Sequence, residues 1–128
     1  MRHDRSDGRR GGDVCVYVNE RLPIIHLKKL ENHDNETLWL LINPHRLPRY
    51  LNLIILGVVY HPPGNVDKAL LAHLAESLDY ALSTNPGAGV VLTGDFNQFR
   101  HSIMQLFNLK HVVKSATNIF DSRMLRKE

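Results

Sequence analysis

Residues 89–97 constrain the fold most, because they place polar side chains directly after an apolar run. Residues 90–92 are Val, Val and Leu, which is typical of a strand buried on both faces. Gly94 then allows the backbone to turn sharply, and Asp95 and Asn97 follow it. In α/β proteins, polar chemistry lies in the crevice beyond the carboxyl ends of the strands. Gly, Asp and Asn are also ordinary turn residues, so a polar turn and a functional site both remain open.

The preceding segment predicts a βαβ unit. Residues 52–60 are almost all apolar, which indicates a central strand, and Pro62 and Pro63 end it. Residues 66–83 predict a helix whose apolar stripe is formed by leucines at helical spacing, with Asn65 as a possible N-cap. The leucines of this stripe are Leu71, Leu74, Leu78 and Leu82, with Leu70 beside them.

A helix between two buried strands makes a crossover connection, so the strands are parallel. We therefore predict that strands near 53–60 and 89–94 are adjacent and parallel, with the helix on one face. Both strands then end at the same edge of the sheet. Four polar residues are expected to line one crevice there: Tyr60, His61, Asp95 and Asn97.

The remaining elements are predicted from shorter patterns. Residues 14–18 and 36–42 are strongly β-prone and indicate strands, the first with Cys15 packed as a small apolar residue and the second with Trp39 as a core or edge anchor. Residues 23–27 are expected to be extended, 45–50 to form a loop, and 101–109 to form a short helix. The sequence thus predicts an α/β fold.

Composition excludes several classes of protein. A chain of 128 residues with a net charge of +3 fits one globular domain, and the small positive excess permits a nucleic-acid partner without demonstrating one. A single cysteine excludes an internal disulfide and a cysteine zinc cluster. No apolar run is long enough for a membrane span, and the Arg-rich start lacks the apolar region of a secretory signal. These observations favour an intracellular location.

The polar residues at the strand ends suit metal-assisted hydrolysis of a phosphoester. Asp95 can ligate a hard cation or orient a water molecule as a base. Asn97 and Tyr60 can donate hydrogen bonds to a phosphate oxygen. No G-x-S-x-G elbow or P-loop motif occurs, which argues against a serine hydrolase and a P-loop enzyme. His61, next to Pro62, is interpreted as a loop histidine rather than a metal ligand.

Four motifs in order carry a resemblance to a known family. They are Gly-Arg-Arg-Gly-Gly-Asp-Val-Cys-Val-Tyr-Val (8–18), Glu-Thr-Leu-Trp-Leu (36–40), Val-Val-Tyr-His-Pro-Pro (58–63) and Leu-Thr-Gly-Asp-Phe-Asn (92–97). With them the chain resembles the endonuclease/exonuclease/phosphatase superfamily. More narrowly, it is similar to the endonuclease domain that precedes the reverse transcriptase in non-LTR retrotransposons. The resemblance covers residues 8–117.

The resemblance implies a partial four-layered α/β sandwich and hydrolysis of phosphodiester bonds with Mg²⁺. DNA is the implied substrate, a reverse transcriptase domain the implied neighbour in the parent polyprotein, and the nucleus the implied location. Carried over, Asp95 would orient or deprotonate the attacking water, Asn97 would hold the scissile phosphate, and Tyr60 would contact it. Thr117 would match a threonine near the substrate groove. The implied organisation is a basic mobile segment (1–12), a partial domain (13–117) and an irregular basic tail (118–128).

The chain also departs from the family pattern. The family's asparagine and metal-binding glutamate lie upstream of the Gly-Arg-Arg-Gly-Gly segment, where this chain begins, and Glu36 belongs to a later strand. The terminal Ser-Asp-His run is absent, and Asp95 is the one candidate metal ligand left. We therefore expect weak or absent Mg²⁺ binding and little activity of this chain alone. An inactive remnant or nucleic-acid-binding module is the alternative function. Exposed edges at 14–18 and 38–42 are expected to favour aggregation.

Overall fold

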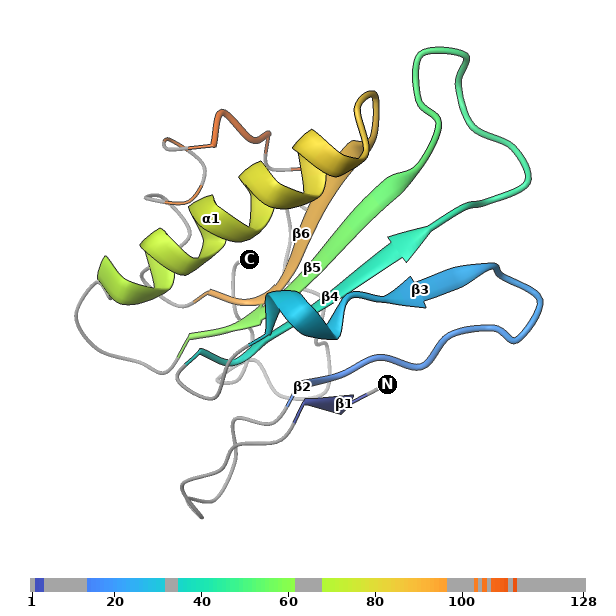
Figure 1. Cartoon of the computed structure of the whole chain (residues 1–128). Coiled ribbons are helices and arrows are strands. Elements are labelled where there is room, and N and C mark those ends of the chain that lie inside the picture. Colours follow the sequence, from blue (N-terminus) through green and yellow to red (C-terminus); the bar gives the residue numbers. More distant parts are fainter. Residues whose placement is uncertain are drawn as a thin grey trace.

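The protein is a mixed α/β structure in which a four-stranded sheet carries a helix on one face and a short two-stranded sheet on the other (Figure 1). The computed structural model describes residues 2–3, 14–31, 35–61, 68–96, 103, 105, 107–110 and 112. Its elements are β1 (Arg2–His3), β2 (Val14–Cys15), β3 (Ile24–His26), the 3-10 helix η1 (Lys28–Leu30), β4 (Thr37–Ile42), β5 (Ile54–Tyr60), α1 (Lys68–Thr84) and β6 (Gly89–Asp95).

The sheet topology confirms the predicted βαβ unit. The strand order is β3-β4-β5-β6, and β4 runs antiparallel to both of its neighbours. β5 and β6 are parallel, and α1 connects them across one face of the sheet (Figure 1). β5 is central, as its apolar sequence predicted. The carboxyl ends of β5 and β6 consequently lie together.

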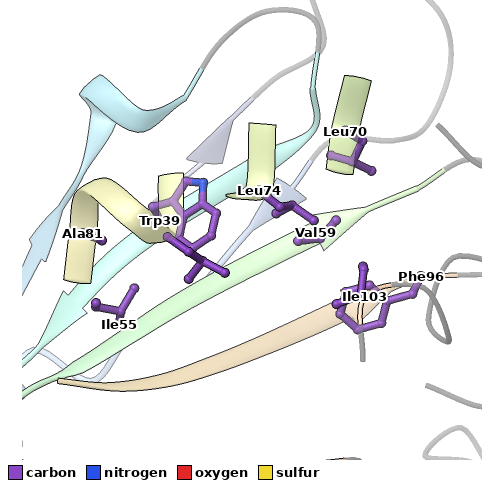
Figure 2. Close-up of a cluster of buried hydrophobic side chains, with 9 residues drawn as sticks. Trp39, Ile55, Val59, Leu70, Leu74, Ala81, Phe96 and Ile103 are labelled. Atoms are coloured by element: carbon purple, nitrogen blue, oxygen red, sulfur yellow. The ribbon is translucent and has the colours of Figure 1, made fainter. Parts of the chain in front are cut away.

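The main core lies between α1 and the sheet (Figure 2). Trp39 is fully buried at its centre, so it is a core residue rather than an edge anchor. Gly57 makes room for it, because a Cβ at this position would lie 2.7 Å from both the Trp39 ring and the Leu92 side chain. The other buried members of this cluster are Ile55, Val59, Leu70, Leu74, Leu78, Ala81, Phe96 and Ile103.

The second cluster covers the opposite face of the sheet. Leu38 and Leu40 of β4 are fully buried there beneath Val14 of β2. The strand predicted at 14–18 is only two residues long, although Val16 and Val18 also pack against this cluster. Cys15 is exposed, which contradicts the prediction that it packs as a small apolar residue. The alternation of side chains along β2 places Val14 inward and therefore Cys15 outward.

Helix α1 buries Leu74 and Leu78 of the predicted stripe, together with Leu70, but not the whole stripe. The buried residues are Leu70, His73, Leu74, Ser77, Leu78 and Ala81, whereas Leu82 is exposed and Leu71 is half-buried. The prediction followed the leucines alone. The true stripe includes small and polar side chains because α1 lies close to the sheet and His73 has a hydrogen-bond partner there. Asn65, the possible N-cap, lies outside the described residues.

Strand β6 is more exposed than the sequence predicted. It is the last strand of the sheet in the part of the chain that the structure describes, and 47% of Val91 is exposed. The prediction of burial on both faces is therefore wrong at Val91. β6 also continues through Gly94 to Asp95 instead of turning at the glycine. Gly94 has a φ of +129°, which glycine adopts without strain.

Several smaller expectations can be compared with the structure. β4 has a neighbour on each side, so the exposed edge predicted at 38–42 is wrong. β1 and η1 were not predicted. Ile103 and Gln105 are helical and the Phe107 N–H donates to the Ile103 carbonyl over 3.1 Å, whereas residues 107–108 form a turn with a φ of +52° at Asn108, so the helix predicted at 101–109 does not reach its predicted end. No helix in the described ranges is long and apolar enough to cross a membrane.

Candidate functional site

The predicted site lies at the carboxyl ends of β5 and β6. Tyr60 and Asp95 are register partners, so their Cα atoms lie side by side on adjacent parallel strands. The next residue, His61, donates its backbone N–H to the carbonyl of Asp95 over 2.9 Å, which extends the pairing by one step. Tyr60 and Asp95 are half-buried, whereas His61 is only 3% exposed. The structure thus brings together three of the four residues predicted to share a crevice.

Tyr60 and Asp95 face away from α1. Val59 packs in the cluster beneath the helix, whereas Tyr60 packs against the cluster of the opposite face. Register partners on parallel strands share a face, so Asp95 lies on the same side as Tyr60. The short β1–β2 sheet covers part of this side (Figure 1). The side chains of Tyr60 and Asp95 therefore lie on the face opposite the helix.

Glu36 is a third polar residue in line with Tyr60 and Asp95, and this position was not predicted from the sequence. The Tyr60 N–H donates to the Glu36 carbonyl over 3.0 Å, one step beyond the Thr37–Val59 register pair. Glu36, one residue before β4, therefore lies beside Tyr60, which in turn lies beside Asp95. Oε2 of Glu36 is buried. The observed register pairs Ile42 with Ile54 rather than with the first residue of the predicted 52–60 strand, so the sequence alone did not reveal this neighbour.

Two predicted site residues lie outside the described part of the chain. They are Asn97 and Thr117. Their predicted roles, on the scissile phosphate and near the substrate groove, stay predictions. Phe96, between Asp95 and Asn97, is buried in the helix-side core together with Ile103. The Phe96 side chain therefore lies on the face opposite to that of Asp95, as expected for consecutive residues of an extended chain.

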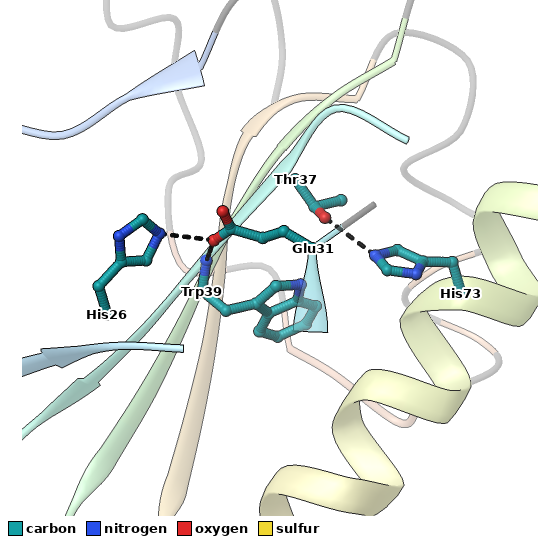
Figure 3. A network of polar contacts seen from close by, with 5 residues as sticks. All are labelled: His26, Glu31, Thr37, Trp39 and His73. Atoms are coloured by element: carbon teal, nitrogen blue, oxygen red, sulfur yellow. Dashed lines mark hydrogen bonds and ion pairs between the residues drawn. The ribbon is translucent and has the colours of Figure 1, made fainter. Parts of the chain in front are cut away.

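A buried hydrogen bond ties α1 to the sheet near the same edge. The Thr37 hydroxyl and Nε2 of His73 lie 2.9 Å apart (Figure 3), and both side chains are buried. Thr37 begins β4 and is the register partner of Val59, next to Tyr60. This contact fixes the distance between α1 and the strands that carry Tyr60 and Glu36. The contact helps to position the site, although it lies on the helix side of the sheet and Tyr60 and Asp95 lie on the opposite side.

A second polar contact lies between β4 and the end of β3. Oε2 of Glu31 lies 2.7 Å from Nε2 of His26 and accepts the backbone N–H of Trp39 over 3.1 Å (Figure 3). β3 ends at His26, so the carboxylate serves the backbone donor that a longer β3 would have paired. This contact supports β4 and the position of Trp39.

The exposed Tyr80 of α1 pairs with Lys29 of η1. The Lys29 ammonium donates to the Tyr80 hydroxyl and lies 4.6 Å from the ring centroid, which makes the hydroxyl its main partner. This hydrogen bond, together with the positive charge of Lys29, lowers the pKa of Tyr80. The pair connects the outer surface of the helix to the β3–β4 connection.

The described residues do not form a complete magnesium site. Among them, no three His, Cys, Asp or Glu side chains lie close enough together to hold a metal ion. Asp95 and Glu36 are carboxylates in the same row, but Tyr60 lies between them. Mg²⁺ is bound in proteins through one or two carboxylates, substrate phosphates and its own waters. Any ion here would depend on substrate and on further residues.

No protein family, curated protein or solved structure was found to match this sequence.

Proposed function

We propose that this chain is part of a phosphodiester-hydrolysing domain of the endonuclease/exonuclease/phosphatase type, with DNA as its substrate. The observation that carries the proposal is the pairing of Tyr60 with Asp95 at the carboxyl ends of two adjacent parallel strands. That edge is where α/β proteins place their chemistry. The motifs that supply both residues are those on which the resemblance rests.

The proposed roles follow from the donor and acceptor groups of the residues. The Asp95 carboxylate accepts a proton from, or orients, the water that attacks phosphorus. The Tyr60 hydroxyl donates a hydrogen bond to a phosphate oxygen of the substrate, and the Asn97 amide donates another. Thr117 contributes to the substrate groove. Because the described residues do not complete a metal site, no step of this proposal passes through Mg²⁺.

The finer architecture is part of the same proposal. In this proposal the four-stranded sheet, with α1 on one face and the β1–β2 sheet on the other, would form part of a four-layered sandwich. The parent protein would be a retrotransposon polyprotein with a reverse transcriptase domain, acting on nuclear DNA. A catalytically inactive remnant that still binds nucleic acid is the second candidate function. It is favoured by the described residues, among which no three His, Cys, Asp or Glu side chains lie close enough together to hold a metal ion.

A plasmid-nicking series tests the proposal. Supercoiled DNA and Mg²⁺ are incubated with this chain, with a version extended by flanking coding sequence, and with the extended version carrying Asp95→Ala. We expect little nicking by this chain, clear nicking by the extended version, and a loss of about a hundredfold or more with Asp95→Ala. The matched control is Asp79→Ala, which removes an exposed carboxylate from α1.

The outcomes separate the two candidate functions. Nicking that falls with Asp95→Ala and not with Asp79→Ala supports the nuclease, whether it appears in the short or the extended version. An extended version that stays folded and binds DNA without nicking it supports the inactive remnant. Nicking that Asp95→Ala leaves unchanged contradicts the proposed role of Asp95.

A further inference from the structure

The loop between β4 and β5 forms an exposed surface that contains none of the proposed catalytic residues. It spans residues 43–53, because Ile42 and Ile54 are the last register pair of the two strands. It projects beyond the end of the sheet (Figure 1). Tyr60 and Asp95 lie at the other end of β5, and the seven residues of this strand separate the two ends by roughly 20 Å. The loop is therefore a separate surface.

The loop presents positive charge together with an aromatic ring. His45, Arg46 and Arg49 are exposed, and 79% of Tyr50 is exposed. Neither arginine forms an ion pair with any residue that the structure describes. The sequence from residue 37 to residue 66 contains no Asp or Glu. The charge of the two arginines is thus not neutralised by the strands that carry the loop.

Hydrogen bonds hold both ends of the loop against neighbouring segments. The Asn43 N–H donates to the Pro23 carbonyl over 3.0 Å. At the other end, the Asn52 side-chain amide donates to the Pro86 carbonyl over 3.0 Å. A turn closed by a hydrogen bond from the Leu51 N–H to the Pro48 carbonyl, 2.9 Å long, has Arg49 and Tyr50 as its two central residues. These contacts limit the conformations of the loop, so less entropy is lost when its side chains meet a ligand.

We propose that this loop binds single-stranded nucleic acid, with Arg46 and Arg49 on backbone phosphates and Tyr50 stacked on an unpaired base. Guanidinium groups pair with phosphate oxygens in a bidentate geometry. An exposed aromatic ring stacks on any base whose face is free. In a duplex each base is already stacked on its neighbours, so its faces are not free. The combination of two cations and one ring therefore fits a single strand better than a duplex or an acidic peptide. This activity goes beyond the proposed hydrolysis, since it needs neither Asp95 nor a metal ion.

Fluorescence anisotropy with a labelled single-stranded DNA of about 12 nucleotides tests the proposal. The titrations contain a chelator and are repeated across a series of salt concentrations. Tyr50→Ala is expected to weaken binding by about tenfold, and Tyr50→Phe to restore most of it. The double variant Arg46→Gln/Arg49→Gln is expected to weaken binding and to reduce the salt slope by about 1.4, because each lost phosphate contact removes about 0.7.

The control is Lys28→Gln/Lys110→Gln, which removes the same charge from exposed residues outside the loop. It is expected to retain the salt slope within about 0.3. Trp39 fluorescence verifies that each variant is folded. The titrations measure binding in the presence of a chelator and the nicking series measures hydrolysis, so a failure of this proposal is distinguishable from a failure of the proposed hydrolysis.

Three outcomes would overturn the proposal. The first is equal weakening by the loop double variant and the control double variant, which would indicate attraction by net charge alone. The second is unchanged binding by Tyr50→Ala together with equal affinity for a duplex of the same sequence. The third is that a polyglutamate peptide displaces the labelled DNA as effectively as unlabelled DNA does, which would indicate a surface for acidic polymers.

Discussion

At the scale of single residues, Gly94 controls the position of Asp95. Its φ of +129° belongs to a region that residues with a side chain rarely adopt. A Cβ at this position would lie 1.9 Å from the carbonyl oxygen of Val59 on the neighbouring strand. The close approach of the two backbones therefore depends on the absence of a side chain. The glycine before Asp95 is thus explained by the pairing of β6 with β5, and a turn is not needed to explain it.

We predict that Gly94→Ala lowers the free energy of unfolding by about 3 kcal/mol or more, through backbone strain and displacement of β5. Urea unfolding followed by the fluorescence of Trp39, the only tryptophan, measures the change. Gly89→Ala is the matched control, since its Cβ would meet only the end of the Leu51 side chain, at 3.2 Å. We expect Gly89→Ala to stay within about 1 kcal/mol. Equal losses from the two substitutions would contradict this reading of Gly94.

Single residues also show where sequence reasoning succeeds. The pairing of Tyr60 with Asp95 could be predicted, because a buried strand, a helix and another buried strand allow very few arrangements. The exposure of Val91 could not, because the apolar run of β6 does not reveal that this strand ends the described sheet. Glu36 was missed for a related reason. Its place beside Tyr60 depends on the register between two strands, which the pattern of apolar residues alone leaves undetermined.

At the scale of elements, the docking of α1 onto the sheet depends on a polar contact within an apolar interface. His73 lies on the buried stripe of the helix. Its partner Thr37 is fully buried, with 0% of its surface accessible. The leucine spacing predicted the existence and the length of the helix. It placed Leu74 and Leu78 on the buried face but missed His73, because the interface accepts His73 only when Thr37 lies opposite it. That pairing is a tertiary contact across 36 residues.

We predict that Thr37→Val destabilises the protein by about 1–3 kcal/mol, because Nε2 of His73 loses a partner in a buried position. Adding His73→Leu should cost less than the sum of the two single substitutions, since replacing both partners removes the unsatisfied group. Thermal or urea unfolding of the four proteins of this cycle measures the coupling. Thr84→Val is the control, because the Thr84 hydroxyl donates to the Tyr80 carbonyl at the exposed end of α1. Strictly additive effects at Thr37 and His73 would contradict the prediction.

At the scale of the whole molecule, the two faces of the sheet are covered unequally. α1 covers the face that contains Trp39, whereas the β1–β2 sheet covers mainly the part of the other face formed by β4 and β5 (Figure 1). The fold class and the parallel pairing of β5 with β6 were predictable from local sequence patterns. The location of the exposed edge was not. Among the described strands the sheet ends at β3 and β6; Val91 of β6 projects from the face opposite the helix, and β4 is interior.

This arrangement predicts that the purified chain associates with itself through β6. An apolar strand at the end of a sheet offers unpaired backbone groups to another chain, and a lysine on such a strand opposes this pairing. Val91→Lys should therefore lower the fraction of oligomer, measured by size-exclusion chromatography with light scattering over a range of concentrations, and should reduce binding of an apolar dye. The substitution should change the free energy of unfolding by less than about 0.5 kcal/mol, because the side chain is already half exposed. Leu82→Lys is the control, since it adds the same charge at an exposed apolar position on α1, away from any strand. If both substitutions reduce association equally, net charge rather than the β6 edge governs it; if neither does, the edge does not mediate association.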